Sequence, residues 1–395
     1  MKILMASDAY KFQTNGVVNV VITLVEGLRK RGHEVKALIP SNCRRSFRDG
    51  DDYYIASIPA FYYPDTRISP VRDNAMIKEL KAWHPDIIHI HSEASMERLA
   101  RSVARVHHTP IVMTTHTDYV QFLFGKYSKA RPARWVGRTW GRRTYRGVRR
   151  VIAPSEKALT FPHMKTALNR AVVIPNGIRL ENYQKRVSPE ERAALFRELG
   201  LSDNGRTIVM ITRISHEKRI GEILRYLPAL LREVPDAHLI IVGDGPNREK
   251  LEAYTRDQGL SRCVRFTGRI PPTEVYRYYG LGNLFVSAST FEVHSLSYLE
   301  AMARGLPLVC RSDACLKGVL EQGVNGYAYT TEEEFVRFCA EILTNPDLQA
   351  KMRQSALQRV EDFSSERFVE HTLELYERVI REAAQEAGPA APGNS

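Results

Sequence analysis

Residues 207–243 read TIVMITRISHEKRIGEILRYLPALLREVPDAHLIIVG. The apolar runs at 207–212 and 238–243 are rich in β-branched side chains, as buried strands are. Between them, 217–233 carries apolar residues at helical spacing. A strand, a helix and a second strand in this order need a crossover connection. The stretch therefore predicts two parallel strands of one sheet, covered by a helix.

The same alternation extends outward over the whole chain of 395 residues. Further strands are expected at 3–7, 34–40, 86–91, 110–116, 151–155, 264–268, 284–289 and 307–311. Further helices are expected at 17–31, 94–106 and 295–304. The sequence therefore predicts an α/β protein built of two Rossmann-like, doubly wound domains.

The alternation is interrupted at Ile174-Pro175-Asn176-Gly177-Ile178, where proline and the Asn-Gly pair favour a turn. We place the domain boundary there, with a first domain at 1–173 and a second at 174–365. A further helix, 366–387, follows once the second domain is complete. The tail, 388–395, is rich in small residues and proline and is expected to be disordered.

The net charge of +12 is concentrated in one segment. Residues 126–150 hold ten basic side chains and no acidic one, and without them the chain is nearly neutral. Such a local positive field points to one anionic surface, a membrane or nucleic acid. From 132 to 150 the pattern is helical and predicts a basic amphipathic helix lying on an anionic bilayer. The arginines expected on one face, at steps of three and four, are Arg131, Arg134, Arg138, Arg142, Arg146 and Arg149. The other interpretation is a solvated helix whose Trp135 and Trp140 pack on the sheet.

Several features favour a cytoplasmic protein. Residues 1–7 are apolar and followed at once by Asp8, which indicates a buried first strand and not a signal peptide. The five cysteines are scattered and contain no CxxC pair, which fits a reducing compartment. No apolar run reaches the roughly 18 residues of a membrane span.

In doubly wound sheets, ligands bind at the carboxyl ends of the strands, so the residues that follow each strand are the candidates. Gly16 opens the helix after the first strand and would let backbone N–H groups approach a diphosphate. His116 ends its strand and would face a cleft between the domains. Arg213 and Lys218 flank a helix start, where two cations form a diphosphate clamp. Each candidate also has a plain structural interpretation. Gly16 could simply form the turn at the start of a helix, and His116 could be a hydrogen-bonded structural histidine. Arg213 and Lys218 could be ordinary surface charges.

Two more candidate segments follow strands of the second half. Gly243-Asp244-Gly245-Pro246 predicts a tight turn at the cleft edge. It is not GxGxxG, and the chain has no such motif, which argues against a dinucleotide-dependent oxidoreductase. Glu292 and Glu300 lie eight residues apart, a spacing that spans about 12 Å of helix. They therefore suit a ligand lying along the helix start, near the hydroxyl of Ser295, and not one reacting atom.

No metal site is expected. Asp49-Gly50-Asp51 has the DxD form of a metal–diphosphate site but lies in a polar loop, so we interpret it as a turn. His89 and His91 share one face of a strand, yet no third ligand stands at a recognisable spacing.

These motifs, in this order, resemble the retaining GT-B glycosyltransferases of family four, over roughly residues 1 to 383. The most specific part is Glu292-x7-Glu300, followed by the stretch Ala301-Met302-Ala303-Arg304-Gly305-Leu306-Pro307. The sequence departs from the family around Glu292, where Phe-Glu-Val-His-Ser replaces the commoner Glu-Gly-Phe-Gly form.

The resemblance implies a GT-B fold, in which the two domains face across a cleft and the last helix returns to the first domain. It implies that Arg213 and Lys218 hold the diphosphate of a nucleotide-sugar donor and that Glu300 binds its ribose. It also implies that Glu292 holds the donor sugar and that His116 helps to position it. The other donor-binding positions that it implies are Gly16, Gly243, Asp244, Gly245, Ser295 and Leu296. The family needs no metal and no further cofactor.

Within the family, the first half is most similar to the bacterial diacylglycerol glucosyltransferases. The similar stretches are Ser7-Asp8-Ala9-Tyr10, Asn15-Gly16-Val17-Val18, Phe61-Tyr62-Tyr63-Pro64, Thr115-His116-Thr117-Asp118-Tyr119 and the basic segment. This similarity implies transfer of glucose from UDP-glucose to a membrane lipid such as diacylglycerol. It further implies a peripheral enzyme on the inner face of the cell membrane, with 126–150 on the anionic lipid surface.

Two alternatives stay open at this point. The same chemistry could act on a soluble sugar, a glycan or phosphatidylinositol. The chain could instead be a non-catalytic basic protein that binds membrane or nucleic acid. The cation clamp and the paired glutamates argue against a mere binding module, and no known nucleic-acid reading motif occurs, so no nucleic-acid partner is expected.

Overall fold

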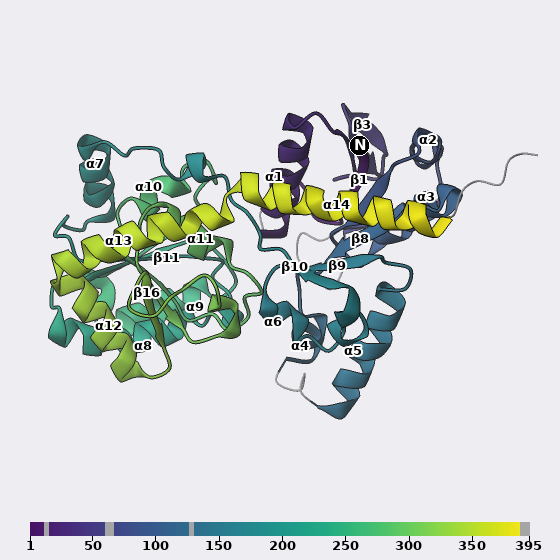
Figure 1. Ribbon diagram of the computed structural model, residues 1–395. Helices are drawn as coiled ribbons and strands as arrows, with labels where there is room; N and C mark the ends of the chain where they lie inside the picture. Colours follow the sequence, from purple (N-terminus) through teal and green to yellow (C-terminus); the bar gives the residue numbers. More distant parts are fainter. Residues whose placement is uncertain (12–15, 60–66, 126–129, 388–395) are drawn as a thin grey trace, which may run out of the picture. The chain divides into compact units, whose positions relative to one another are not determined.

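The computed structural model describes residues 1–11, 16–59, 67–125 and 130–387 (Figure 1). The chain forms two compact units. Unit 1 comprises residues 1–177 together with the chain from residue 365 onward, and unit 2 comprises residues 178–364. The expected boundary at 174 lies four residues before this division. The reason is that Ile174 still bonds within unit 1, where its N–H donates to the carbonyl of Ala153 at 3.1 Å.

Unit 1 is built on a sheet of eight strands, in the order β10-β9-β8-β7-β1-β2-β4-β3. Only β3 runs antiparallel to its neighbour. The strands are β1 (Lys2–Ala6), β2 (Glu34–Pro40), β3 (Phe47–Asp49), β4 (Asp52–Ile55), β7 (Ile87–Ile90), β8 (Ile111–Thr114), β9 (Arg150–Ala153) and β10 (Ala171–Val173). A separate pair is formed by β5 (Ile58–Pro59) and β6 (Arg67–Ile68). The five strands expected in this half are confirmed within two residues at each end, and the short β3, β4 and β10 were not foreseen.

The helices of unit 1 connect these strands. They are α1 (Gly16–Lys30), α2 (Ala75–Trp83), α3 (Ser95–His107), α4 (Tyr119–Phe124), α5 (Arg131–Thr144), α6 (Glu156–Leu159) and α14 (Ser365–Ala387). The expectation that the basic segment is helical to residue 150 is wrong. The helix α5 ends at Thr144 because Gly147 turns the chain, with φ of 73°, and Arg150 then begins β9.

Unit 2 is built on six parallel strands in the order β13-β12-β11-β14-β15-β16. They are β11 (Thr207–Ile211), β12 (His238–Val242), β13 (Val264–Gly268), β14 (Leu284–Ser287), β15 (Leu308–Arg311) and β16 (Gly326–Tyr329). In chain order this is 3-2-1-4-5-6, the arrangement of a Rossmann domain. The two-domain α/β fold predicted from the sequence is thereby confirmed. How the two domains face each other across a cleft stays a prediction.

Helices cover both faces of the unit 2 sheet. They are α7 (Pro189–Leu199), α8 (Ile220–Glu233), α9 (Arg248–Asp257), α10 (Val275–Tyr279), α11 (Leu296–Ala303), α12 (Glu332–Thr344) and α13 (Pro346–Val360). Along β11, Ile208 and Met210 pack with α8 and α12, whereas Val209 packs with α11 and α13 on the other face. This alternation follows from the two-residue period of a strand, and it explains why the run at 207–212 is apolar throughout.

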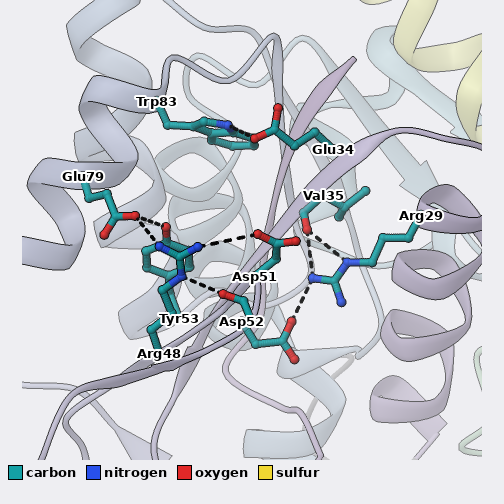
Figure 2. A network of polar contacts seen from close by, with 10 residues as sticks. Arg29, Glu34, Val35, Arg48, Asp51, Asp52, Tyr53, Glu79 and Trp83 are labelled. Atoms are coloured by element: carbon teal, nitrogen blue, oxygen red, sulfur yellow. Dashed lines mark hydrogen bonds and ion pairs between the residues drawn. The ribbon is translucent and has the colours of Figure 1, made fainter.

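In Asp49-Gly50-Asp51, Asp49 ends β3, and Gly50 and Asp51 form the hairpin turn to β4, so the interpretation as a turn is confirmed; Gly50 has φ of 56°. Figure 2 shows the acidic side chains here beside arginines: Asp51 lies 3.9 Å from Arg48, and the buried Asp52 accepts from Arg29 Nη2 at 2.9 Å. These carboxylates therefore stabilise the edge of the sheet. Within the described part of the chain, no helix combines the length and apolar character that spanning a bilayer requires.

The helix α14 joins unit 1 by lying against α1 (Figure 1). The approach is close at Gly27 of α1, where an added Cβ would lie 2.5 Å from Cγ2 of Val369. Farther along α14, the hydroxyl of the buried Tyr376 lies 2.6 Å from Nδ1 of His89. Because the two helices approach so closely at Gly27, this position has no room for a larger side chain.

We predict that Gly27→Ala lowers the free energy of unfolding by about 1–3 kcal/mol, because the new methyl group must displace Val369 or α14. Gly221→Ala, in α8, is the matched control, since its nearest atom would be 3.5 Å away. This control should be neutral or stabilise by up to about 1 kcal/mol, as alanine favours a helix over glycine. Thermal and urea unfolding measure both effects, and equal stabilities for the two variants would contradict the prediction.

Candidate functional site

The strand order of unit 2 reverses between β11 and β14, so the chain leaves these neighbouring strands in opposite directions. In open α/β sheets this switch point is where ligands bind. Arg213 and Lys218 follow β11, with Lys218 in the short 3-10 helix η5 (His216–Lys218), and Glu292 follows β14. The ammonium group of Lys218 forms an ion pair with the carboxylate of Glu292, and both side chains are largely buried. The fold thus brings together two residues that the family resemblance assigns to different parts of the donor.

A second ionic group fixes the chain just beyond Lys218. Arg219 has a left-handed backbone, with φ of 53°, and its guanidinium bonds the carboxylate of Glu222. Glu222 is buried and also accepts from Arg311 Nη1 at 2.7 Å and from the hydroxyl of Tyr329 at 3.1 Å. Burial alone would raise the pKa of Glu222, but the two guanidinium groups hold it below its ordinary value. Glu222 is therefore a charged anchor for the start of α8.

The glycines after β12 are required by close backbone packing. A Cβ at Gly243 would lie 1.9 Å from the carbonyl oxygen of Thr212, and one at Gly245 would lie 2.3 Å from that of Ile214. Between them, the carbonyl of Asp244 accepts from the N–H of Ile214 at 2.9 Å. The Gly-Asp-Gly turn therefore holds the loop that carries Arg213.

Glu300 lies in α11 between two tyrosines. Its Oε1 accepts from the hydroxyl of Tyr183 at 2.7 Å, and its Oε2 accepts from the hydroxyl of Tyr279 at 2.8 Å. Burial raises the pKa of Glu300. A carboxylate can accept about four hydrogen bonds, so a hydroxyl pair such as that of a ribose can still be bound. The tyrosines orient the carboxylate, and the sequence contains no local signal for either.

The start of α11 combines uncapped backbone donors with a buried histidine. Ser295 is the N-cap residue of α11, but its side chain makes no capping hydrogen bond. Its hydroxyl oxygen lies instead 2.9 Å from that of Ser297. The first backbone N–H groups of the helix, from Leu296 onward, therefore lack a side-chain cap. His294 is buried, and neither ring nitrogen has a hydrogen-bond partner among the described residues. Burial lowers the pKa of His294 to about 4, so the ring is neutral at pH 7 and offers one donor and one acceptor.

In unit 1, the half-buried His116 lies beside two buried histidines, His89 and His91. Its Nε2 lies 3.0 Å from Nδ1 of His91. The neighbouring His89 uses both nitrogens, toward Tyr376 at 2.6 Å and toward Oγ1 of Thr114 at 2.7 Å. Burial lowers the pKa of His116 to about 4 and that of His89 to about 3, so both rings are neutral. Within the described ranges, no group of three or more histidine, cysteine or acidic side chains is arranged to hold a metal ion.

Two acidic residues at the same sheet edge were not foreseen. Asp8 follows β1 and accepts from the backbone N–H groups of Ser95 and Met96 at 3.1 Å, so it caps α3. Glu93 follows β7 and accepts from the hydroxyl of Tyr119. Burial raises the pKa of Glu93 to about 8. Both could have been found from the sequence by the same strand-end rule that indicated Arg213.

Gly16 is the first residue of α1 and is exposed. Thr14 and Asn15, which precede it in the proposed phosphate loop, lie outside the described residues, as do Lys126 and Lys129 of the basic segment.

In the structure, the described basic segment divides into the helix α5 and the residues that follow it. On α5, Arg134, Arg138, Arg142 and Arg143 are exposed, whereas Ala133, Gly137 and Gly141 are buried against unit 1. The ring of Trp140 packs 4.6 Å from that of Tyr119, and Trp135 is 68% exposed. Arg149 and Arg150 lie beyond the helix and pair with Glu386 and Glu382 of α14. The expectation that Arg149 shares the arginine face of the helix is therefore wrong.

Comparison with known proteins agrees with this architecture. Residues 14–182 match the family model described as Glycosyltransferase Family 4, and residues 191–359 match that described as Glycosyl transferases group 1. The chain is 27% identical over 387 residues to the alpha-monoglucosyldiacylglycerol synthase of Acholeplasma laidlawii, covering 95% of this chain and 96% of that protein. It is 28% identical over 382 residues to the synthase of the same name from Streptococcus pneumoniae, covering 95% and 85%.

Among solved structures, Anabaena HepE in complex with UDP superimposes with a TM-score of 0.73 at 17% identity, covering 96% of this chain and 100% of that one. The two matching family models follow each other in the order of the two units and together span most of the chain. The chain therefore belongs to the GT-B glycosyltransferases, with a family four amino-terminal part and a group 1 carboxyl-terminal part.

Proposed function

We propose that this glycosyltransferase transfers glucose from UDP-glucose to the hydroxyl group of diacylglycerol in a membrane, with retention of the α configuration. The observation that carries the proposal is the meeting of Lys218, Glu292 and the Arg213 loop at the switch point of unit 2. The choice of donor sugar and acceptor is supported by the two relatives named alpha-monoglucosyldiacylglycerol synthase, which match along 95% of this chain.

The proposed mechanism assigns each residue a separate part of the donor. Arg213 and Lys218 bind the diphosphate and stabilise its negative charge as the bond to the sugar breaks. Glu292, oriented by Lys218, binds sugar hydroxyls, and His116 of unit 1 helps to position the sugar. Glu300 accepts hydrogen bonds from the ribose. The acceptor hydroxyl attacks on the face that the diphosphate leaves, and the diphosphate takes its proton, so no enzyme nucleophile is needed.

The acceptor is proposed to be reached at a membrane surface. The exposed arginines of α5 and the exposed Trp135 beside them are suited to the interface of an anionic bilayer. Phosphatidylinositol is the second candidate acceptor, because the chain is also 25% identical, over 377 residues, to the phosphatidyl-myo-inositol mannosyltransferase of Mycobacterium tuberculosis.

The proposed reaction is tested with a panel of nucleotide sugars. Each is offered with diacylglycerol vesicles, phosphatidylinositol vesicles or soluble sugars, and NMR reads the anomer of each product. We expect α-glucosyldiacylglycerol from UDP-glucose and no comparable product from the other pairs. Product formed only on a soluble sugar would contradict the lipid acceptor, and a β-linked product would contradict retention.

We predict that Arg213→Ala and Lys218→Ala each lower kcat/KM by about 10²-fold or more, because contacts that strengthen as the diphosphate departs stabilise the transition state by roughly 3 kcal/mol. Glu300→Ala should mainly raise the KM for the donor. The control is Arg225→Ala, which removes an exposed arginine of α8. Near-native kinetics in both cation variants would remove the clamp from the mechanism.

We predict that transfer persists in EDTA, because the two cations occupy the role that a divalent metal has in other diphosphate sites. Initial rates are compared in the presence and absence of the chelator. Complete loss of activity that magnesium or manganese restores would contradict the prediction.

A further inference from the structure

A small cavity of about 260 Å³ lies in unit 1 beside the basic helix α5. Four basic side chains from three elements line it. They are Arg134 and Arg138 of α5, Lys157 of α6 and Lys165 of the 3-10 helix η2 (Met164–Thr166). We call this cavity the basic pocket. Arg134 and Arg138 are one helical turn apart and therefore share a face of α5.

The positive charge of the basic pocket is largely uncompensated. Arg134, Arg138 and Lys165 form no ion pair with any residue that the structure describes. Among the residues that the structure describes, Asp118 is the one carboxylate that lines the pocket. Its Oδ1 accepts from the N–H groups of Val120 and Gln121 as the N-cap of α4. The pocket therefore holds four cations and one carboxylate, and this carboxylate already accepts hydrogen bonds from backbone N–H groups. The excess of positive charge favours an anionic ligand.

The pocket is held in shape by close packing behind α5. A Cβ at Gly137 would lie 2.5 Å from Cγ2 of Val120, and one at Gly141 would lie 2.2 Å from the carbonyl oxygen of His163. The two glycines therefore let the backbone of α5 rest directly on α4 and on the segment that leads into η2. This contact fixes the backbone of α5 beside the segment that leads to Lys165. The exposed side chains of Arg134 and Arg138 therefore extend from a rigid backbone toward a ligand.

The size and the donors of the basic pocket fit a phosphate group. Guanidinium groups bind phosphate oxygens through paired N–H donors, and lysines add point charges. The hydroxyl of Thr160 and the amide of Gln121 also line the cavity and can donate hydrogen bonds. Beside Arg134, Trp135 is 68% exposed, as expected of a residue at a membrane interface.

We propose that the basic pocket binds the phosphate group of an anionic phospholipid headgroup and so anchors unit 1 at one defined lipid. The inference rests on the proposed action at a membrane and adds a discrete site to it. It differs from general attraction to a charged surface, because the residues of α6 and η2 take part as well as those of α5.

The test compares two double variants that remove the same charge from the same helix. The pocket variant, Arg134→Gln with Arg138→Gln, removes two of the four positive charges that line the basic pocket. The control variant, Arg142→Gln with Arg143→Gln, removes two exposed arginines of α5 that do not line it. Binding is measured by sedimentation with phosphatidylcholine vesicles that contain phosphatidylglycerol. We expect the pocket variant to bind at least about ten-fold more weakly than the control variant, since general attraction is equal for both. Equal binding of the two variants would overturn the pocket.

Soluble glycerol phosphate distinguishes the source of the phosphate group. At ionic strength matched with sodium chloride, it should release the wild type and the control variant from vesicles. Binding of glycerol phosphate by a wild type that does not sediment with vesicles would overturn the lipid assignment. Failure of the wild type to glucosylate diacylglycerol in detergent micelles would instead contradict the proposed function, whatever the vesicles show.

A further variant covers the case in which the pocket variant does not fold. Arg134→Lys with Arg138→Lys keeps the charge but loses the paired donors of arginine. It should bind phosphatidylglycerol vesicles more weakly than the wild type, and binding equal to the wild type would overturn recognition of the phosphate by the arginines.

Discussion

The reversal of strand order at the centre of each sheet is the constraint on which the candidate site depends. In unit 2, β11 and β14 are neighbours, yet the chain continues from one toward β12 and from the other toward β15. The loops that follow them therefore diverge, and ligands bind at such a point in open α/β sheets. Lys218 and Glu292, 74 positions apart in sequence, form an ion pair there. The same reversal in unit 1, between β1 and β7, brings Asp8 close to the start of α3.

The residues around this switch point act in part through one another. Lys218 orients Glu292, and the buried Glu222 holds the turn that follows Lys218. Gly243 and Gly245 bring the turn after β12 against the loop of Arg213, where a side chain would collide with backbone oxygens. The positions of the charged groups therefore depend on the close backbone packing around them. A substitution at either glycine would displace the loop of Arg213, although neither glycine has a side chain that contacts a ligand.

The sequence was sufficient to predict the two-domain fold, because strand and helix periods are local and repeat in a regular order. It also indicated Arg213, Lys218 and Glu292, since each follows a strand. The partners of these groups were beyond its reach. Tyr183 and Glu300 are 117 positions apart, and only the folded chain joins them. Glu222 could have been suspected as an acid within the apolar stripe of α8, next to Ile223 and Leu224.

The basic segment shows the opposite limit of sequence reasoning. The steps of three and four between arginines predicted one face, but helical spacing cannot reveal which residues of other elements lie beside that face. Lys157 and Lys165 enter the basic pocket from α6 and η2, and Arg149 and Arg150 are drawn to acids of α14. Charge counting along the chain therefore overestimates the exposed helical face and misses the cavity next to it.

The return of α14 to unit 1 has a consequence for how the protein folds while it is synthesised on the ribosome. Unit 1 contains both ends of the described chain, and its contact between His89 and Tyr376 spans 287 positions. Domains generally fold as units while the chain is being synthesised, but this one receives its last helix only after the whole of unit 2 has been made. Until α14 has been synthesised, the face of α1 that packs against α14 stays uncovered. Unit 2 is continuous in sequence and can therefore complete its folding first. The domain that begins the chain is thus the last to be completed.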